Sequence, residues 1–242
     1  MHSFDRVAET YESGRPAYPD RIFEALEPLA GALVLEGGAG TGIASRALIE
    51  RGARLVAYDV GRAILLRARA ASPGLRAVVA DGGAMPFRDG QADLVCFAQA
   101  WHWIDERHRC EEAARVLRAG GRWAGWWSHA RADGESWFDS SWDRVESACP
   151  GTDRGQRDID WADGLRRSGL FAVDDRVTVR WTRHVSVEQW MLDENSKSYV
   201  AALSPEEHRQ LVGALDDLVR ARFPDGRMSV PYETWLWTAH KI

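Results

Sequence analysis

The sequence has few cysteines, no cluster of basic residues and no long apolar run. Its 242 residues include three cysteines, Cys96, Cys110 and Cys149, with no CxxC or cysteine–histidine spacing typical of zinc. This scarcity excludes a disulfide framework and predicts no metal site. The formal net charge of -5 and the lack of a Lys/Arg cluster predict that nucleic acid is not a partner.

Segments that could enter a membrane are also lacking. No apolar stretch approaches the ~20 residues that a bilayer-spanning helix needs, so we expect no membrane partner. The N-terminal residues, MHSFDRVAETYESGRP, are polar from the start and do not resemble a signal peptide. We therefore expect a cytoplasmic protein that acts on a small-molecule substrate, and the sequence indicates nothing about its oligomeric state.

What is present is an alternation of short apolar runs and helical patterns. The runs that predict strands are residues 32–35, 54–58, 76–79, 93–98 and 121–127. Amphipathic sequence typical of helices follows at 43–51, 62–71 and 106–117. This alternation predicts a mostly parallel sheet with helices on both faces.

The pattern changes after Ser128. Residues 131–168 are expected to form helices and loops, and residues 171–181 alternate like one long strand. Two helices are predicted at 186–202 and 205–222, and a final strand at 228–241.

The segment LVLEGGAGTG, residues 33–42, combines a strand, an acid near its end and a glycine loop that runs into a helix. Glycines adopt positive φ and let a ligand approach the backbone, and a helix N-terminus offers unpaired N–H groups to an anion. Ligands of open parallel sheets bind at the carboxyl ends of the strands. The dinucleotide fingerprint GxGxxG fails, because its sixth position would be Ile43 or Ser45.

The residues match acid-x-GxGxG instead, with Glu36, Gly38, Gly40 and Gly42. In this motif the sequence resembles the class I S-adenosylmethionine-dependent methyltransferases, with S-adenosylmethionine as cofactor. The resemblance implies that Glu36, Gly38 and Gly40 bind the cofactor.

Two more acids, Asp59 and Asp81, are predicted at the ends of the second and third strands. The resemblance implies that Asp59 accepts both ribose hydroxyls, which suits an acceptor-only carboxylate, with Val60 beside it. It also implies that Asp81 receives the adenine amino group, with the Gly82 N–H near the ring.

Two further segments, FDRVAETYESGRPAYP and QAWHWID, resemble a small-molecule branch of the family that includes trans-aconitate methyltransferase-like proteins. In that branch the N-terminal segment folds over the cofactor. The resemblance implies that Tyr11 and Arg15 approach the methionine part, where an arginine suits a carboxylate, and that Gln99 touches the cofactor. One departure is Gly37, where the family usually has an apolar residue.

The acceptor pocket is expected where the fourth and fifth strands end. Its predicted lining is Trp101, His102, Trp103, Trp127 and His129. His102 is the candidate catalytic residue, because a histidine can act as a general base at neutral pH. The alternative is that His102 only forms hydrogen bonds in the wall of the acceptor pocket. Other tryptophans, among them Trp137, Trp142, Trp161 and Trp190, lie in the insertion, where such spacing is more typical of a core.

The sequence thus predicts an α/β, Rossmann-like class I methyltransferase fold, with a mostly parallel seven-stranded sheet, helices on both faces and an antiparallel last strand. One domain is expected over residues 1–242. Its parts are a lid and first helix at 1–30, a cofactor-binding core at 31–130, a substrate-side insertion and late strand at 131–225, and a final strand at 226–242.

The predicted activity is methyl transfer from S-adenosylmethionine to a small molecule, aromatic or a carboxylic acid, in natural-product metabolism. One alternative is a protein of the same fold that binds the cofactor without transferring methyl, as a cyclase or a sensor. The other is a nicotinamide-dependent oxidoreductase, which the failed fingerprint disfavours.

Overall fold

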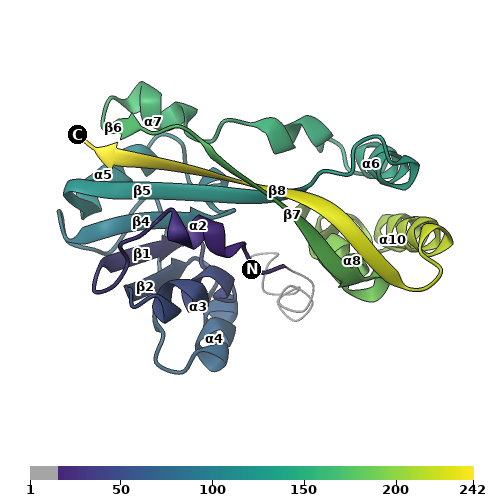
Figure 1. Ribbon diagram of the computed structural model, residues 1–242, viewed down its shortest axis with the longest axis horizontal. Helices are drawn as coiled ribbons and strands as arrows, with labels where there is room; N and C mark the ends of the chain where they lie inside the picture. Colours follow the sequence, from purple (N-terminus) through teal and green to yellow (C-terminus); the bar gives the residue numbers. More distant parts are fainter. Residues whose placement is uncertain (1–15) are drawn as a thin grey trace. The chain divides into compact units, whose positions relative to one another are not determined.

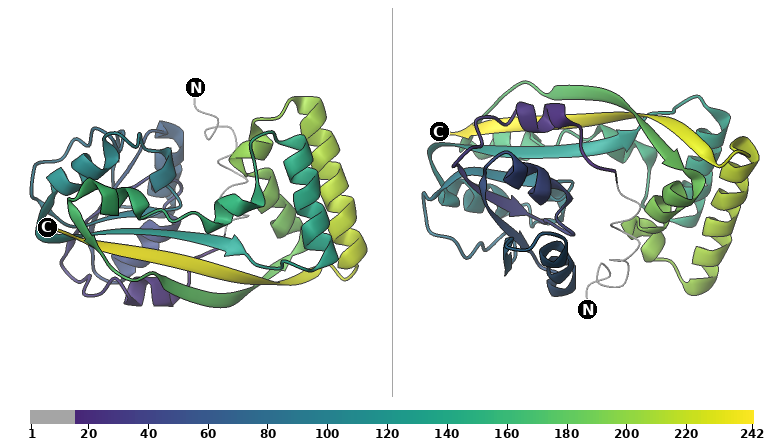
Figure 2. Two further views of the ribbon diagram at one scale, coloured as in Figure 1. Left: turned by 90° about the horizontal axis from the view of Figure 1, so that it is seen from above. Right: turned by 60° about the horizontal axis from the view of Figure 1, so that its bottom comes forward.

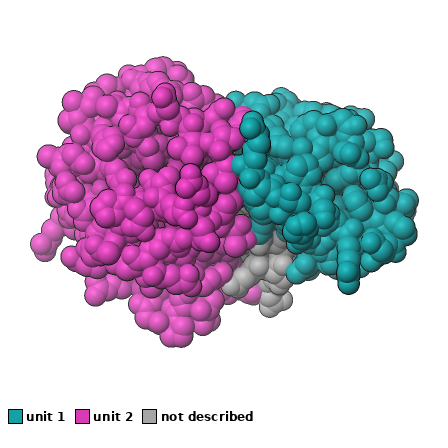
Figure 3. Space-filling model, viewed as in Figure 1, with its two compact units in different colours: residues 1–16, 129–159, 180–233 teal, residues 17–128, 160–179, 234–242 magenta. Residues whose placement is uncertain are grey.

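The protein, seen in a computed structural model, is described over residues 16–242. Its contacts divide it into two compact units, which Figure 3 colours separately. In the described part, unit 1 comprises residue 16 with residues 129–159 and 180–233, and unit 2 comprises 17–128, 160–179 and 234–242. Across residues 16–242, every helix is too short or too polar to cross a bilayer.

Unit 2 is built on parallel strands. The central strand β1 (Leu33–Gly37) lies between β2 (Arg54–Asp59) and β4 (Ala92–Ala98), with β3 (Arg76–Val79) beyond β2 and β5 (Leu117–Ala130) beyond β4. All four of these pairs are parallel. The carboxyl ends of β1 to β4 therefore face the same edge of the sheet, where ligands of open α/β sheets bind.

The sheet ends in antiparallel pairing. The last strand, β8 (Arg227–Lys241), neighbours β5 and pairs antiparallel with β6 (Phe171–Val173); Figure 1 shows β8 running back along β5. With β7 (Val177–Ser186), which also pairs with β8, the sheet of residues 16–242 has eight strands. The fold class is confirmed, with one strand more than the seven predicted.

The extra strand arises because the run predicted as one strand, 171–181, divides into β6 and β7. Asp174 stands at the break, and acidic residues are poor strand formers. Its carboxylate accepts a hydrogen bond from the Thr238 hydroxyl at 2.7 Å, which holds the chain at the break.

Helices cover both faces of this sheet. Along β4, Leu94 and Cys96 enter one core cluster while Val95 and Phe97 enter the other, as the two-residue period of a strand requires. The helices that share the first cluster are α2 (Asp20–Glu24), α3 (Ile43–Glu50) and α4 (Arg62–Ala71). Those that share the second are α5 (Arg109–Val116) and α7 (Asp163–Ser168).

Unit 1 has its own core, which is formed by helices and by residues of β7 and β8. Its helices are α6 (Ser136–Ala148), α8 (Val187–Asn195), α9 (Ser198–Ala201) and α10 (Pro205–Arg222); Figure 2 shows α6 beside α10. The helix predicted over 186–202 divides into α8 and α9 near Ser196. The Ser196 hydroxyl donates to the Asp193 carbonyl at 2.7 Å, a local bond that competes with continued helix.

A buried ion pair lies within unit 1. The Arg183 guanidinium donates to the Asp193 carboxylate at 2.7 Å and to the Tyr232 hydroxyl at 3.0 Å. Both charged side chains are almost fully buried. Removing one partner of such a pair leaves an uncompensated buried charge.

Candidate functional site

The glycine loop between β1 and α3 has the backbone that its sequence predicts. Gly38, Gly40 and Gly42 have positive φ values of 63°, 56° and 81°, a region that glycine adopts without strain. At Gly38 a side chain is also excluded by packing, because a Cβ would clash with the Cβ of Ala100. The residues after β4 therefore lie directly against this loop.

Glu36, next to the end of β1, is a buried acid. Its Oε2 accepts a hydrogen bond from the Ser45 hydroxyl of α3 at 2.5 Å, and its Oε1 has no hydrogen-bond partner within the described residues. Burial raises the pKa of Glu36 to about 7, the Ser45 hydrogen bond opposes this rise, and the charge of Asp59 adds to it. Thr41 Oγ1, in the glycine loop, is likewise buried without a partner in the described part of the chain.

Asp59 ends β2 and ties the glycine loop to that strand. Its Oδ2 accepts the Gly40 N–H at 3.0 Å and its Oδ1 accepts the Gly61 N–H at 2.8 Å. Since each carboxylate oxygen has two acceptor sites, further donors can still bind. Val60, beside it, is half exposed.

Asp81 and Gly82 follow β3, which ends at Val79, so Asp81 lies in the loop rather than at the strand end. The Asp81 carboxylate accepts the Gly83 N–H at 2.6 Å. A Cβ at Gly82 would lie 2.5 Å from Ile104 Cδ1, so a larger residue would require that side chain to move. The segment after β4 thus packs against this loop as well as against the glycine loop.

Gln99, the residue after β4, has a φ of 55°, a left-handed conformation that no other non-glycine residue of 16–242 adopts. Its N–H donates to the Trp126 carbonyl at 2.9 Å, and its side-chain amide donates to the Tyr18 hydroxyl at 3.4 Å. Such backbone conformations occur disproportionately at functional sites.

Trp101 begins the short 3-10 helix Trp101–Trp103, and its ring is fully buried. It packs against Phe97 and Trp123, with ring centroids 4.7 and 5.2 Å away. The Arg109 guanidinium lies over the same indole, 5.1 Å from its centroid. The ring of Trp101 therefore has no surface open to a ligand in this structure.

His102 lies in a cluster of aromatic rings. Trp103 and Trp161 have centroids 4.9 and 5.2 Å from the imidazole, and Trp161 stacks on Trp127 at 5.1 Å with an interplanar angle of 17°. The indole N–H of Trp127 donates to His102 Nδ1 at 3.4 Å. Burial lowers the pKa of His102 to about 4, and the positive charge of Arg109 lowers it further, so the ring is neutral at pH 7.

Two residues of unit 2, Trp161 and Ile104, contact the candidate site but are not among the residues predicted to belong to it. Trp161 is one of the tryptophans assigned to the core of the insertion, and it joins His102 through a fold contact that no local pattern marks. Ile104 packs on Gly82, but nothing in the sequence distinguishes it from any other apolar residue. Of the remaining predicted residues, Tyr11 and Arg15 lie outside the described residues, and His129 belongs to unit 1.

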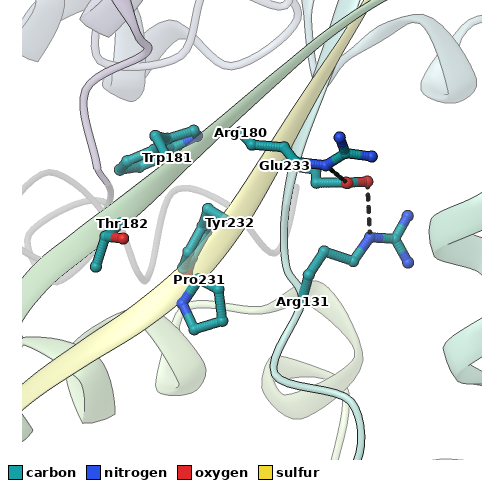
Figure 4. A pocket seen from close by; sticks show the side chains of 7 residues that line it. All are labelled: Arg131, Arg180, Trp181, Thr182, Pro231, Tyr232 and Glu233. Atoms are coloured by element: carbon teal, nitrogen blue, oxygen red, sulfur yellow. Dashed lines mark hydrogen bonds and ion pairs between the residues drawn. The ribbon is translucent and has the colours of Figure 1, made fainter.

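Unit 1 has a hollow of about 390 Å³. Figure 4 shows its lining, in which the Glu233 carboxylate lies between two arginines, at 2.8 Å from Arg180 Nε and 3.6 Å from Arg131 Nε. Arg131 also pairs with Asp158 at 2.8 Å. The charges of the hollow are thus matched within unit 1.

Comparison with known proteins gives one consistent answer. The family described as "Methyltransferase domain" matches residues 35–124. An uncharacterised methyltransferase of Mycobacterium tuberculosis is 36% identical over 180 residues, covering 70% of this chain and 74% of that protein. The chain belongs to the class I S-adenosylmethionine-dependent methyltransferases.

Solved structures agree in fold with this methyltransferase. A candidate type II methyltransferase from Anaeromyxobacter dehalogenans has a TM-score of 0.70 at 21% identity and covers 94% of this chain and 97% of its own. Geranyl diphosphate C-methyltransferase from Streptomyces coelicolor, solved with S-adenosyl-L-homocysteine, has a TM-score of 0.53 at 13% identity and covers 92% of this chain and 74% of its own.

S-adenosylmethionine is the cofactor, and the residues of unit 2 fit it. Carboxylates stand near the end of, at the end of, or just after three adjacent parallel strands, and such groups accept hydrogen bonds from hydroxyl and amino groups. The glycine loop leaves its backbone open to a ligand. In the same region, Glu36 Oε1 and Thr41 Oγ1 are buried and have no hydrogen-bond partner within residues 16–242. Both oxygens could therefore accept a hydrogen bond.

Proposed function

We propose that this methyltransferase transfers the methyl group of S-adenosylmethionine to a small molecule that is aromatic or a carboxylic acid. The observation that supports this proposal is the placement of residues 100–104. Ala100 packs on the glycine loop and Ile104 on Gly82, and between them His102 and Trp103 begin the aromatic cluster. A planar acceptor would thus find aromatic surface beside the cofactor loops.

The cofactor contacts follow from the same arrangement. Glu36, Gly38 and Gly40 would shape the loop that receives the cofactor, and Asp59, with Val60 beside it, would accept the ribose hydroxyls. Asp81 and Gly82 would meet the adenine.

The methionine part would meet Gln99 and two residues outside the described part, Tyr11 and Arg15. Residues 1–30 would provide a lid and the first helix of a single domain, as the resemblance to the trans-aconitate methyltransferase-like branch implies.

The bound cofactor supplies an electrophilic methyl group on a positively charged sulfur. The chain's own residues hold the acceptor in line with that methyl, because orientation at near-attack distance supplies much of the acceleration of such a reaction. Trp103 and Trp127, with His102, are the proposed acceptor residues, and the neutral ring of His102 would contact the reacting group.

The experiment is incubation of the purified protein with methyl-labelled S-adenosylmethionine and a panel of carboxylic acids, phenols and indoles. Mass spectrometry should find the label in one of these classes, and Trp161→Ala should lower that yield. Label recovered only in added protein or nucleic acid would refute the small-molecule proposal.

A further inference from the structure

The contact between His102 and Trp127 fixes which imidazole nitrogen carries the proton. An indole N–H donates and never accepts, so His102 Nδ1, which receives it at 3.4 Å, must be unprotonated. A neutral imidazole then carries its proton on Nε2. Within the described residues, Nε2 has no hydrogen-bond partner, and the His102 side chain is only partly buried.

A nitrogen that carries a proton donates a hydrogen bond and cannot take a proton from an acceptor. To serve as a base through Nε2, the ring would first have to move its proton to Nδ1, where it would face the Trp127 N–H. The rings of Trp103 and Trp161 lie beside the imidazole, tilted to it by 40° and 35°, and limit its rotation away from this contact.

The electrostatic surroundings favour a negative partner. Arg109 is 8% exposed, its Nε is buried without a partner in the described part of the chain, and Nη1 donates to the Trp101 carbonyl at 3.4 Å. Its nearest carboxylate, Glu106, is 3.5 Å away, mostly exposed and shared with Arg167. Exposed carboxylates are well solvated and neutralise a buried charge only in part.

We propose that His102 donates its Nε2–H to an anionic oxygen of the acceptor, which therefore reaches the site already ionised, as a carboxylate does. This inference rests on the proposed transfer to a small molecule and narrows it to oxygen acids. The carboxylate oxygen forms the bond to the methyl carbon while the carbon–sulfur bond breaks and its electron pair remains on sulfur. Anion and sulfonium become neutral ester and thioether, and no proton moves.

Variants of His102 separate a donor from a base. Glutamine places an amide N–H near the position of Nε2 but cannot act as a base, and phenylalanine keeps a ring without any donor. We expect His102→Gln to retain kcat/KM within ~10-fold, and His102→Phe to lose ~10–150-fold, the loss of one hydrogen bond to a charged group. If both variants lose ~10²–10⁴-fold, His102 is a base and the proposal is overturned.

The substrate probes are matched acids and alcohols: benzoate, phenylacetate and indole-3-acetate against benzyl alcohol, 2-phenylethanol and tryptophol. Methyl esters of the acids support the proposal, and methyl ethers of the alcohols overturn it. Each pair shares one ring, so the comparison isolates the ionised oxygen from the aromatic contact.

A spectroscopic measurement is independent of turnover. Nitrogen-15 NMR of histidine-labelled protein, with the His102 signal assigned by its loss in His102→Gln, should show the Nε2–H form at pH 7. Trp127→Phe should abolish this preference for the Nε2–H form. Trp161→Phe should keep it, because the Trp161 indole makes no hydrogen bond to the His102 imidazole. An Nδ1–H form in the unmutated protein overturns the proposal, even if a small molecule is methylated.

Discussion

The buried acid Glu36 predicts an unusual dependence of stability on pH. Its pKa is 4.5 in an unfolded chain and about 7 in the fold. A raised pKa means that the folded state holds the proton more tightly, so its stabilising effect is complete below pH 4.5 and is lost as pH rises to about 7. At 1.36 kcal/mol per pKa unit, the loss is about 3 kcal/mol.

The variant Glu36→Gln tests this, because glutamine has the shape of a protonated glutamate and no charge. At pH 8 we expect its free energy of unfolding, measured in urea, to exceed that of the unmutated protein by about 3 kcal/mol. At pH 5 the two free energies of unfolding should differ little. Tryptophan fluorescence without cofactor reports the transition. The control Glu50→Gln, on the exposed face of α3, should change stability by less than about 0.5 kcal/mol at either pH.

Two results would contradict this prediction: Glu36→Gln is no more stable than the unmutated protein at pH 8, or the difference in stability is the same at pH 5. Either result would mean that the carboxylate is solvated or paired in its ionised form. Ser45→Ala checks the assignment, because removal of the hydroxyl takes away the one hydrogen bond that lowers the pKa of Glu36, and the pH-dependent loss should grow.

Substitutions at Asp59, Gly38 and Arg183 each test one contact or one backbone position. Asp59→Ala should weaken S-adenosylhomocysteine binding by about 1.5–3 kcal/mol in calorimetry. It should also lower stability, because Asp59 accepts hydrogen bonds from the N–H groups of Gly40 and Gly61. Unchanged affinity would mean that Asp59 does not bind the ribose. Gly38→Ala should abolish binding of S-adenosylhomocysteine in calorimetry. The control Gly213→Ala, on α10 with open space around it, should keep that binding and raise the melting temperature slightly. Equal binding by both variants would contradict the loop geometry. Arg183→Met should lower stability by about 3–5 kcal/mol, because Asp193 loses its buried guanidinium partner. Arg180→Met, at an exposed arginine beside Glu233, should change stability by less than about 0.5 kcal/mol. Similar losses in the two variants would refute the role of burial.

The first half of the fold could be predicted from the sequence because its signals are local. The strands β1 to β4 and the helices α3 and α4 begin and end within about two residues of the apolar runs that predicted them. The departure at Gly37 has a structural reason that no single-sequence pattern contains. A Cβ there would clash with Phe97 and lie 2.5 Å from the Tyr58 hydroxyl, so two large neighbours occupy the space of a side chain.

The candidate site could be predicted only in part. The glycine loop and the acids after the strands are local motifs, but the contact of His102 with Trp161 joins residues far apart in sequence and depends on the fold. Likewise, the hydrogen bond that fixes which imidazole nitrogen of His102 carries the proton comes from Trp127, which lies on the neighbouring strand β5. For the same reason the sequence alone left the base and the wall residue as open alternatives.

Following one methyl group from donor to acceptor tests the proposed transfer to a small molecule. The protein is incubated with S-adenosylmethionine, labelled on the methyl, and with a mixture of small aromatic acids, and both products are counted in the same sample. We expect one labelled small molecule for every S-adenosylhomocysteine formed, and neither product when the Gly38→Ala variant replaces the unmutated protein. Bound cofactor that stays intact with every acid, or label that appears only in macromolecules, would contradict it.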